Sequence, residues 1–221
     1  MEQKEIYALG VGHNTPVFVD LAEACGYRVA GLYHYNNTRT GELDHGIPIL
    51  GSFKDLFSEK LRSKNILLTM GNMRIRRELH TRIVEAGGKI PTLIHPSSIV
   101  SRFANIAESG VLINPFCYIQ AGASVDDGTV ILSHVNISHN TSIGENCFIA
   151  GGATVGAYTV VEDYVFIGQG ALCISDKVKL IGANAFIGAG ALVTKPVPQS
   201  VIVAGSPAKI LRKRNDSKGK F

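Results

Sequence analysis

The sequence predicts a chain of two parts, a small parallel α/β domain followed by a parallel β-helix. From Ile113 to Ile167 an Ile or Val recurs at every sixth position, and the position four residues later is always small or β-branched. Before residue 89, short apolar stretches alternate with helical patterns and glycine-containing turns. Alternation of this kind is typical of βαβ units. The six-residue period is typical of stacked coils of short strands.

A period of six excludes a helix as the repeating unit. With 3.6 residues per turn, the Ile and Val residues would be carried around every face of a helix. Ordinary antiparallel strands would instead show turn signals at irregular spacing. A chain that turns a corner every six residues closes a three-sided coil in about eighteen residues, with its Ile and Val column stacked inward at roughly 4.8 Å.

The α/β part starts with a βαβ unit. A strand over 5–9 is followed by the turn 10–14, a helix over 16–25 and a second strand over 28–33. A glycine turn between strand and helix exposes backbone N–H groups to a phosphate, although the same glycines also suit any tight turn. We expect the domain to span residues 1–88 and to continue with a strand over 47–51, a helix over 53–61, a strand over 65–69 and a helix over 74–86.

The β-helix is expected over residues 89–202. Its first turns begin at Ile94, and one extra residue shifts the register before Ile113. The register breaks again over 173–179 and then resumes at Ile181. The remaining residues, 203–221, form a basic tail that we expect to leave the coil and start a short basic helix.

Composition restricts the class of protein. The hydrophobic fraction of 45% is enough for a packed core, and the net charge of +4 is mild. The four cysteines form no CxxC pair, which indicates neither a zinc ribbon nor a redox motif. No stretch resembles a signal peptide or a membrane span. We therefore expect a soluble, cytoplasmic protein that binds neither nucleic acid nor membrane.

Several linked motifs carry a family resemblance from about Ile6 to Arg212. They are Gly10-Val-Gly12-His13, Met70-Gly71-Asn72 with Arg76-Arg77, Leu93-Ile-His95-Pro96-Ser97, and the closing Gly205-Ser-Pro-Ala-Lys209. With the repeats, they resemble the hexapeptide-repeat acyltransferases, and within these the NeuD/PglD group of sugar acetyltransferases. The resemblance implies a Rossmann-like first domain, a left-handed β-helix, a homotrimer, and acetyl-CoA bound between neighbouring coils.

The catalytic candidates are polar residues that the repeat does not require. His134 and His139 occupy non-core positions, and His139 matches the histidine that the resembled family uses as general base. A neutral imidazole titrates in the range needed to accept a proton from an attacking amine or hydroxyl. Asn140 stands where family members commonly have an acid, and Phe148 stands where they have a second histidine. His134 is a candidate to replace that second histidine.

Acetyl-CoA is expected to contact bare backbone in the coils beyond His139. Glycines allow such an approach, although each of them also suits a corner that needs only their backbone shape. Lysines near the end of the coil are candidates for the phosphates of the cofactor. The predicted cofactor-binding residues are Gly151, Gly152, Gly168, Gly170, Gly188, Gly190, Lys195 and Lys209.

The acceptor implied by the resemblance is a nucleotide-linked amino sugar, expected to be a 4-amino-4,6-dideoxy sugar, bound by the α/β domain. The predicted substrate-binding residues are Gly10, Gly12, His13, Asn14, Tyr33, His34, Tyr35, Asn36, Gly71 and Asn72. Tyr33 or Tyr35 is expected to stack on the base and Asn36 to bond it. The acidic pair that family members often carry at this strand end is absent. Another nucleotide, or O-acetylation of sialic acid or a related sugar, is the alternative.

Two further classes of function compete with this interpretation. A carbonic anhydrase on the same coil would use His134 and His139 as zinc ligands, because their spacing matches that enzyme. A catalytic zinc needs a third protein ligand, and only His95 lies near the required position, so no metal is expected. A non-catalytic nucleotide-sugar sensor is suggested by Asn140 and Phe148 together.

Overall fold

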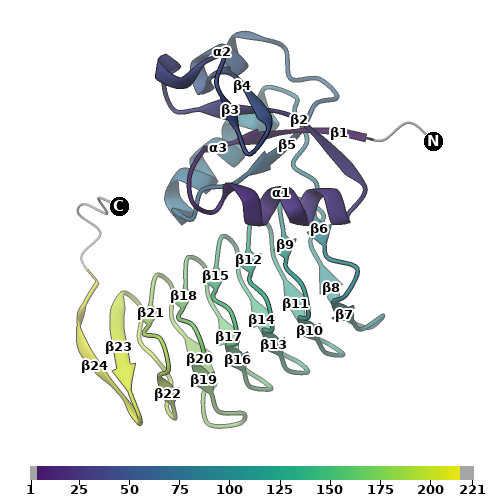
Figure 1. Ribbon diagram of the computed structural model, residues 1–221. Coiled ribbons are helices and arrows are strands. Elements are labelled where there is room, and N and C mark those ends of the chain that lie inside the picture. The colour runs from purple at the N-terminus through teal and green to yellow at the C-terminus, as the bar shows by residue number, and fades with distance from the viewer. Residues whose placement is uncertain (1–3, 215–221) are drawn as a thin grey trace. The chain divides into compact units, whose positions relative to one another are not determined.

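The computed structural model describes residues 4–214, which form two compact units. The first unit comprises the residues up to 96 together with 108–112, and the second comprises 97–107 and the residues from 113 onward. The segment 108–112 therefore returns to the first unit after the coil has begun. Figure 1 shows the strands of the α/β unit in purple and blue and the coils in teal to yellow.

The α/β unit is built on a five-stranded sheet in the order β3-β4-β2-β1-β5. Strands β4, β2, β1 and β5 are parallel, as predicted, whereas β3 is antiparallel to β4 and was not expected. Its elements are β1 (Lys4–Leu9), α1 (Thr15–Ala24), β2 (Tyr27–His34), the 3-10 helix η1 (Asn37–Arg39), β3 (Leu43–Asp44), β4 (Ile47–Ser52), α2 (Phe53–Ser58), β5 (Asn65–Leu68), α3 (Met73–Glu85) and β6 (Leu93–Ile94).

Helix α2 is shorter than predicted, because it ends at Ser58 rather than at residue 61. Its start is well defined: the Ser52 side chain accepts from the Asp55 N–H, and the Asp55 carboxylate accepts from the Ser52 N–H, which is a capping box. After Ser58 the backbone of Glu59 is extended. Leu61 then lies fully buried in the core beside Leu9 and Ile83, so its apolar side chain is placed without a further helical turn.

The second unit is a parallel β-helix with three faces. The first face contains β7 (Ile99–Val100), β10 (Tyr118–Ile119), β13 (Asn136–Ile137), β16 (Thr154–Val155), β19 (Leu172–Cys173) and β22 (Leu192–Val193). The second contains β8 (Asn105–Ile106), β11 (Ser124–Val125), β14 (Ser142–Ile143), β17 (Val160–Val161) and β20 (Leu180–Ile181). The third contains β9 (Leu112–Ile113), β12 (Val130–Ile131), β15 (Phe148–Ile149), β18 (Phe166–Ile167), β21 (Phe186–Ile187), β23 (Val201–Gly205) and β24 (Ala208–Lys213).

The predicted Ile and Val column forms the core of this coil. In the first face, Ile119 pairs in register with Ile137, which pairs with Val155, and all three are fully buried. Complete burial of such a side chain stabilises the fold by about 1.5–3 kcal/mol. The fold class expected from the sequence, a Rossmann-like α/β unit and a parallel β-helix, is confirmed.

The small residues four positions after each Ile or Val are also buried, and several are polar. The hydroxyl of Thr129 donates to the carbonyl of Gly144 at 2.8 Å, and the hydroxyl of Thr141 donates to the carbonyl of Gly156 at 2.8 Å. The thiol of Cys147 donates in the same way to the carbonyl of Glu162. A buried hydroxyl or thiol is tolerated here because the next coil presents a carbonyl to it.

The predicted basic helix after residue 203 is wrong. Residues 201–205 and 208–213 form strands β23 and β24, which pair with each other in antiparallel fashion. Strand β23 also pairs with β21 in parallel, so it extends the third face of the coil. The pairing of backbone groups with a neighbouring strand outweighs the helical preference of the Ala-Lys-Ile-Leu-Arg-Lys stretch. The tail residues 215–221 lie outside the described part of the chain.

Candidate active site

His139 lies at the corner between the first and second faces, which we call the histidine corner. Successive coils place Ala121-Gly122, His139-Asn140 and Ala157-Tyr158 at this corner. The His139 side chain is exposed, and its Nδ1 lies 3.0 Å from the side-chain Oδ1 of Asn140. Its backbone N–H donates to the side-chain oxygen of Gln120 at 3.2 Å. Residues of two coils therefore hold the histidine.

The contact with Asn140 determines which ring nitrogen of His139 carries the proton. An amide oxygen can only accept, so Nδ1 must be the donor. In the neutral ring the lone pair is then on Nε2, the nitrogen that points away from Asn140. Asn140 thus supplies the orientation that an acid would give, without a charge. The arrangement is suited to a general base acting through Nε2.

Asn140 is itself held from the coil before it. Its backbone N–H donates to the carbonyl of Ala121 at 3.1 Å. Its side-chain nitrogen lies 2.9 Å from the position that a Cβ atom at Gly122 would occupy. Gly122 therefore leaves the room that the Asn140 amide occupies, and any larger residue would displace the partner of His139.

His134 lies at a different corner, one side of the coil away from His139. It follows β12, whereas His139 follows β13, and its ring packs on Phe116 with 5.1 Å between ring centroids. The two histidines share no contact. Among the described residues no group of three or more His, Cys, Asp or Glu side chains could hold a metal ion.

The predicted glycines gather at one corner, between the third and first faces, which we call the glycine corner. Successive coils place Gly151-Gly152, Gln169-Gly170 and Ala189-Gly190 there. A side chain at Gly170 or Gly190 would enter open space. The same left-handed conformation at other corners is adopted by Asn140, Tyr158 and Tyr164. The turn geometry does not require glycine, and the bare backbone at this corner therefore suits close approach of a ligand.

Gly168 and Gly188 have a different reason to be glycine. A side chain at Gly168 would lie 2.5 Å from the backbone nitrogen of Ala189, and one at Gly188 would lie 2.8 Å from the Ala204 side chain. These two glycines are needed for stacking of the coils. Lys195 follows β22 at the end of the histidine corner and Lys209 lies in β24, and both side chains are exposed. No described contact joins either lysine to the glycine corner.

Phe148 belongs to an aromatic ladder on the third face. Its ring stacks on Phe166 with 5.6 Å between centroids, and Phe166 stacks on Phe186 at 4.4 Å. Phe148 is only 8% exposed. The aromatic side chain at this position is therefore explained by stacking with the coils that follow, and it brings no polar group to the histidine corner.

In the α/β unit, the turn after β1 has a defined shape. Gly10 has a positive φ of 109°, and the hydroxyl of Thr69 donates to its carbonyl and to that of Leu9. The N–H of Gly12 donates to the hydroxyl of Thr15, the first residue of α1. Gly12 and the neighbouring His13 and Asn14 are exposed. The turn thus lies beside the N-terminus of α1, and a phosphate contact there stays a prediction.

The turn between β5 and α3 lies against the first turn. The Asn14 side-chain nitrogen lies 3.4 Å from where a side chain at Gly71 would begin. Asn72 is the N-cap of α3, since its side-chain oxygen accepts from the N–H groups of Arg74 and Ile75. Asn14 makes no such cap at α1 and keeps its amide for other contacts. Asn72 therefore has a structural role, whereas Asn14 remains a candidate for ligand binding.

Arg76 is a buried arginine that binds the backbone of the turn between β5 and α3. Its guanidinium donates to the carbonyls of Leu68 and Met70, and its Nε has no partner among the described residues. The side chain is 2% exposed, and desolvation lowers its pKa to about 10. A buried cation without a carboxylate partner is costly. The Arg76 guanidinium therefore places a positive charge near the turns that follow β1 and β5.

The residues at the end of β2 differ in accessibility. Tyr33 is 5% exposed and packs in the core beside Leu9 and Leu56, so it cannot stack on a base as predicted. Tyr35 is 72% exposed, and its ring lies 4.1 Å from that of His34. The side-chain oxygen of Asn36 lies 2.8 Å from His34 Nδ1 and accepts from Thr38. Only Tyr35 presents a free aromatic face.

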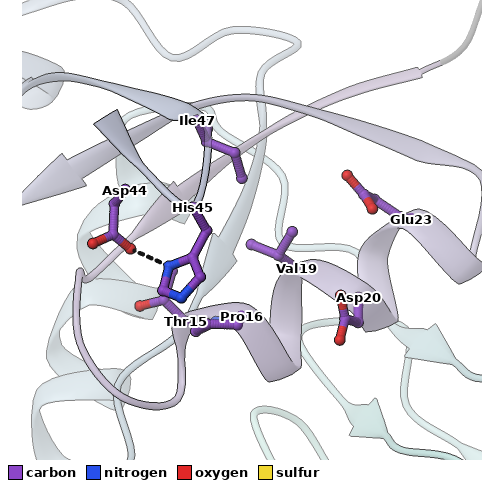
Figure 2. Close-up of a pocket in the computed structure, with 8 residues that line it drawn as sticks. All are labelled: Thr15, Pro16, Val19, Asp20, Glu23, Asp44, His45 and Ile47. Carbon is purple, nitrogen blue, oxygen red and sulfur yellow. Dashed lines mark hydrogen bonds and ion pairs between the residues drawn. The ribbon is translucent and has the colours of Figure 1, made fainter. Parts of the chain in front are cut away.

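A pocket of about 210 Å³ lies between α1 and the β3–β4 turn. Figure 2 shows its lining, with the ring of His45 beside Thr15 and Pro16 and with Nδ1 of His45 3.0 Å from the Asp44 carboxylate. Burial acts to raise the pKa of Asp44, but hydrogen bonds from His45 and Arg39 outweigh it and hold the pKa below its ordinary value. Because Asp20 and Glu23 also line it, the pocket favours groups that donate hydrogen bonds.

Sequence reasoning missed Gln120, Gly122 and Tyr158 as neighbours of His139. Each lies on the coil before or after it, about one full coil away in sequence. Counting one coil in each direction from His139 would have found them.

No helix among residues 4–214 is long and apolar enough to cross a membrane.

Comparison with known proteins agrees with the fold. No family model matches the chain. GDP-perosamine N-acetyltransferase of Escherichia coli is 30% identical over 196 residues, which cover 87% of each protein. A histidine-to-asparagine variant of perosamine N-acetyltransferase from Caulobacter crescentus, solved with CoA and GDP-perosamine, has a TM-score of 0.85 at 26% identity, covering 93% of this chain and 96% of that one. The acetyltransferase domain of PglB from Neisseria gonorrhoeae, solved with acetyl coenzyme A, has a TM-score of 0.84 at 28% identity, covering 95% and 100%.

The coil and the similarity to these relatives identify a hexapeptide-repeat acyltransferase. Within that class, the chain belongs to the NeuD/PglD-like family of sugar acetyltransferases.

Proposed function

We propose that this enzyme transfers the acetyl group of acetyl-CoA to the amine of a nucleotide-linked amino sugar, with His139 as general base. The observation that carries the proposal is the exposed imidazole whose Nδ1 is bonded to Asn140, which leaves the lone pair on Nε2. Two of the relatives named above, those of Escherichia coli and Caulobacter crescentus, are perosamine N-acetyltransferases, and the second was solved with GDP-perosamine, an amino sugar linked to a nucleotide. Chemistry at the site and similarity along the chain point to the same reaction class.

The reaction needs one proton transfer in each direction. As the neutral amine attacks the thioester carbonyl, its nitrogen loses a proton to Nε2 of His139, and a carbon–nitrogen bond forms. The carbon–sulfur bond then breaks, and the leaving thiolate of CoA takes the proton from the imidazolium. Asn140 keeps the ring oriented in both steps through its contact with Nδ1.

Acetyl-CoA is proposed to lie along the glycine corner, against Gly152, Gly170 and Gly190. The support is that all three have positive φ and carry no side chain, while other corners with the same φ carry large ones. Gly151 continues this bare surface. Lys195 and Lys209 are exposed and available for the phosphates. Gly168 and Gly188 contribute by coil stacking instead.

The nucleotide is proposed to bind at the edge of the α/β sheet where β1, β2 and β5 end. Gly10, Gly12, His13 and Asn14 present backbone and polar atoms beside the N-terminus of α1, and Gly71 lies beside Asn14. The buried charge of Arg76 favours an anion there. Tyr35 is proposed to stack on the base, next to His34 and the amide of Asn36.

The active form is proposed to be a homotrimer with shared sites. Within one chain the histidine corner and the glycine corner lie on opposite edges of the first face. That face also exposes large apolar side chains, with Ile99 at 65%, Tyr118 at 47% and Leu172 at 43%. Exposed apolar surface of this kind marks an interface. A neighbouring copy would cover it and bring the glycine corner of one chain to His139 of the next.

The experiment that tests the catalytic assignment compares thiol release from acetyl-CoA by the wild type, His139→Ala and His134→Ala. The acceptor is a nucleotide-linked 4-amino sugar. Loss of a general base costs about 10²- to 10⁴-fold in turnover, so His139→Ala should be nearly inactive while still binding acetyl-CoA by calorimetry. His134→Ala removes the other candidate histidine, and its turnover should stay well above that of His139→Ala because His134 is not the base. Activity retained by His139→Ala, or lost only in His134→Ala, would show that the base has been misassigned.

A further inference from the structure

Tyr158 contacts the imidazole of His139 from the coil that follows it. Strands β13 and β16, which precede the two residues, pair in register, so Tyr158 takes on its coil the position that Asn140 has on the coil before, next to His139. Their ring centroids are 5.1 Å apart and the ring planes meet at 89°. An edge-to-face arrangement at this distance is the favoured geometry for two aromatic rings. The backbone N–H of Tyr158 also donates to the carbonyl of His139.

The tyrosine is not explained by the packing of the coil. Its side chain is 49% exposed, so it contributes little to the core. Its φ of 60° is the left-handed conformation, for which Asn is a better residue, as at Asn146 and Asn184. An exposed aromatic ring at a strained corner therefore calls for a reason other than stability.

A second feature holds the tyrosine ring in place. The coil after β19 contains extra residues where the repeat is interrupted, and Lys179 at the end of this insertion lies over the Tyr158 ring, 5.5 Å from its centroid. Lys179 is in turn paired with Asp176 at 3.1 Å. The insertion thus covers one side of the ring that contacts His139. The sequence showed this interruption without a function for it.

We propose that Tyr158 is a positioning residue that restricts rotation of the His139 imidazole, so that Nε2 stays directed outward for the acceptor amine. The inference rests on the proposed role of His139 as base. Nδ1 of His139 has a single neutral partner in Asn140, and one hydrogen bond leaves the ring free to rock about it. The perpendicular tyrosine ring adds a second contact with the imidazole, which restricts this rotation. Well-oriented reacting groups gain rate because their geometry is fixed before the reaction.

The chain offers a matched control for this pair. Tyr164 occupies the corresponding left-handed position, with φ 59°, at the corner between the second and third faces, which holds neither the base nor the proposed cofactor surface. Replacing either aromatic residue by Asn removes the ring and suits the backbone conformation equally. Tyr164→Asn therefore measures the effect of losing an aromatic ring at a corner that holds neither the base nor the proposed cofactor surface.

The test measures kcat and KM for both substrates in Tyr158→Asn, Tyr158→Phe, Tyr164→Asn and His139→Ala, together with thermal melting of each. In Tyr158→Asn we expect kcat to fall about 3- to 10-fold, with both KM values within about twofold of the wild type. This fall in kcat corresponds to the energy of an edge-to-face contact, at tenfold in rate per 1.36 kcal/mol. Tyr158→Phe should restore the wild-type kcat because the ring is retained. Tyr164→Asn should keep the wild-type kcat and KM values.

Several outcomes would overturn the inference. An unchanged kcat in Tyr158→Asn, with His139→Ala inactive, would refute the positioning role and leave the proposed base intact. An equal loss in Tyr164→Asn would indicate a general effect on the coil, and a loss in Tyr158→Phe would assign the effect to the hydroxyl. Full activity in His139→Ala would instead refute the proposed function itself.

Discussion

At the scale of single residues, His139 depends on neighbours that the chain brings from other coils. Gln120 bonds its backbone, Asn140 bonds Nδ1, and Tyr158 packs on the ring. Gly122 acts on His139 through Asn140, because its lack of a side chain leaves space for the Asn140 amide. A residue that touches no substrate is thus expected to affect the reaction through the orientation of the base.

Gly122→Ala tests this dependence. The new methyl group would begin 2.9 Å from the Asn140 side-chain nitrogen and should displace it, which we expect to lower kcat about tenfold through loss of the fixed imidazole. Gly128→Ala is the control, because Gly128 has nearly the same φ, 69° against 71°, and lies in the same way beneath Asn146. Both variants should lose stability in thermal melts, but only Gly122→Ala should lose turnover. Equal loss of turnover in the two would argue against the role of Asn140.

How well residues could be predicted depended on what determines their position. The Ile and Val column was readable because burial selects the same type at the same position of every coil. Tyr33 was misjudged because both faces of the α/β sheet are covered, and sequence alone did not say which tyrosine of the strand end faces the core. Tyr158 was missed because its role arises from contact with the next coil.

At the scale of elements, local signals and pairing compete. The side chains of Ser52 and Asp55 form a capping box that fixes where α2 begins. No comparable side-chain signal marks the end of the helix at Ser58. The C-terminal stretch was predicted as a helix from its composition, yet it pairs with β23. Starts of helices are encoded by a few adjacent side chains, but strand pairing depends on a partner that is supplied by the rest of the fold.

The capping box predicts a pH dependence of stability. Hydrogen bonds from the backbone and side chain of Ser52 hold the pKa of Asp55 below its ordinary value. A depressed carboxyl pKa contributes stability above the unfolded-state value of about 3.9, and this contribution is lost as the pH falls through the folded-state pKa. Asp55→Asn should therefore melt at a lower temperature near neutral pH and lose less of its melting temperature on acidification.

Asp20→Asn is the control for this measurement, since Asp20 is exposed on α1 and caps no helix. Its melting curve should follow that of the wild type at each pH. If acidification lowered the melting temperature of Asp55→Asn as much as that of the wild type, the capping carboxylate would not be the group responsible.

At the scale of the whole molecule, the proposed trimer makes each site depend on two chains. His139→Ala lacks the base, and Gly170→Tyr fills the glycine corner with a side chain that the same turn accepts at Tyr158 and Tyr164. Each variant alone should be nearly inactive. Mixed trimers, formed by co-expressing the two variants in equal amounts, should be active at roughly a quarter of their sites. Only there does a chain that keeps His139 meet a chain that keeps Gly170. Mixtures that stay inactive, although they form trimers by light scattering, would show that each chain holds its own complete site.

The central claim is that this enzyme forms an amide on a nucleotide-linked amino sugar. It is tested most directly by presenting acetyl-CoA with amino sugars, free and linked to UDP, GDP or dTDP, and by determining the acetylated atom of any product by NMR. The account predicts acetylation of one nucleotide-linked 4-amino sugar at its nitrogen and none of the free sugar. An ester on a hydroxyl of an unlinked sugar such as sialic acid, with no reaction at any amine, would contradict it.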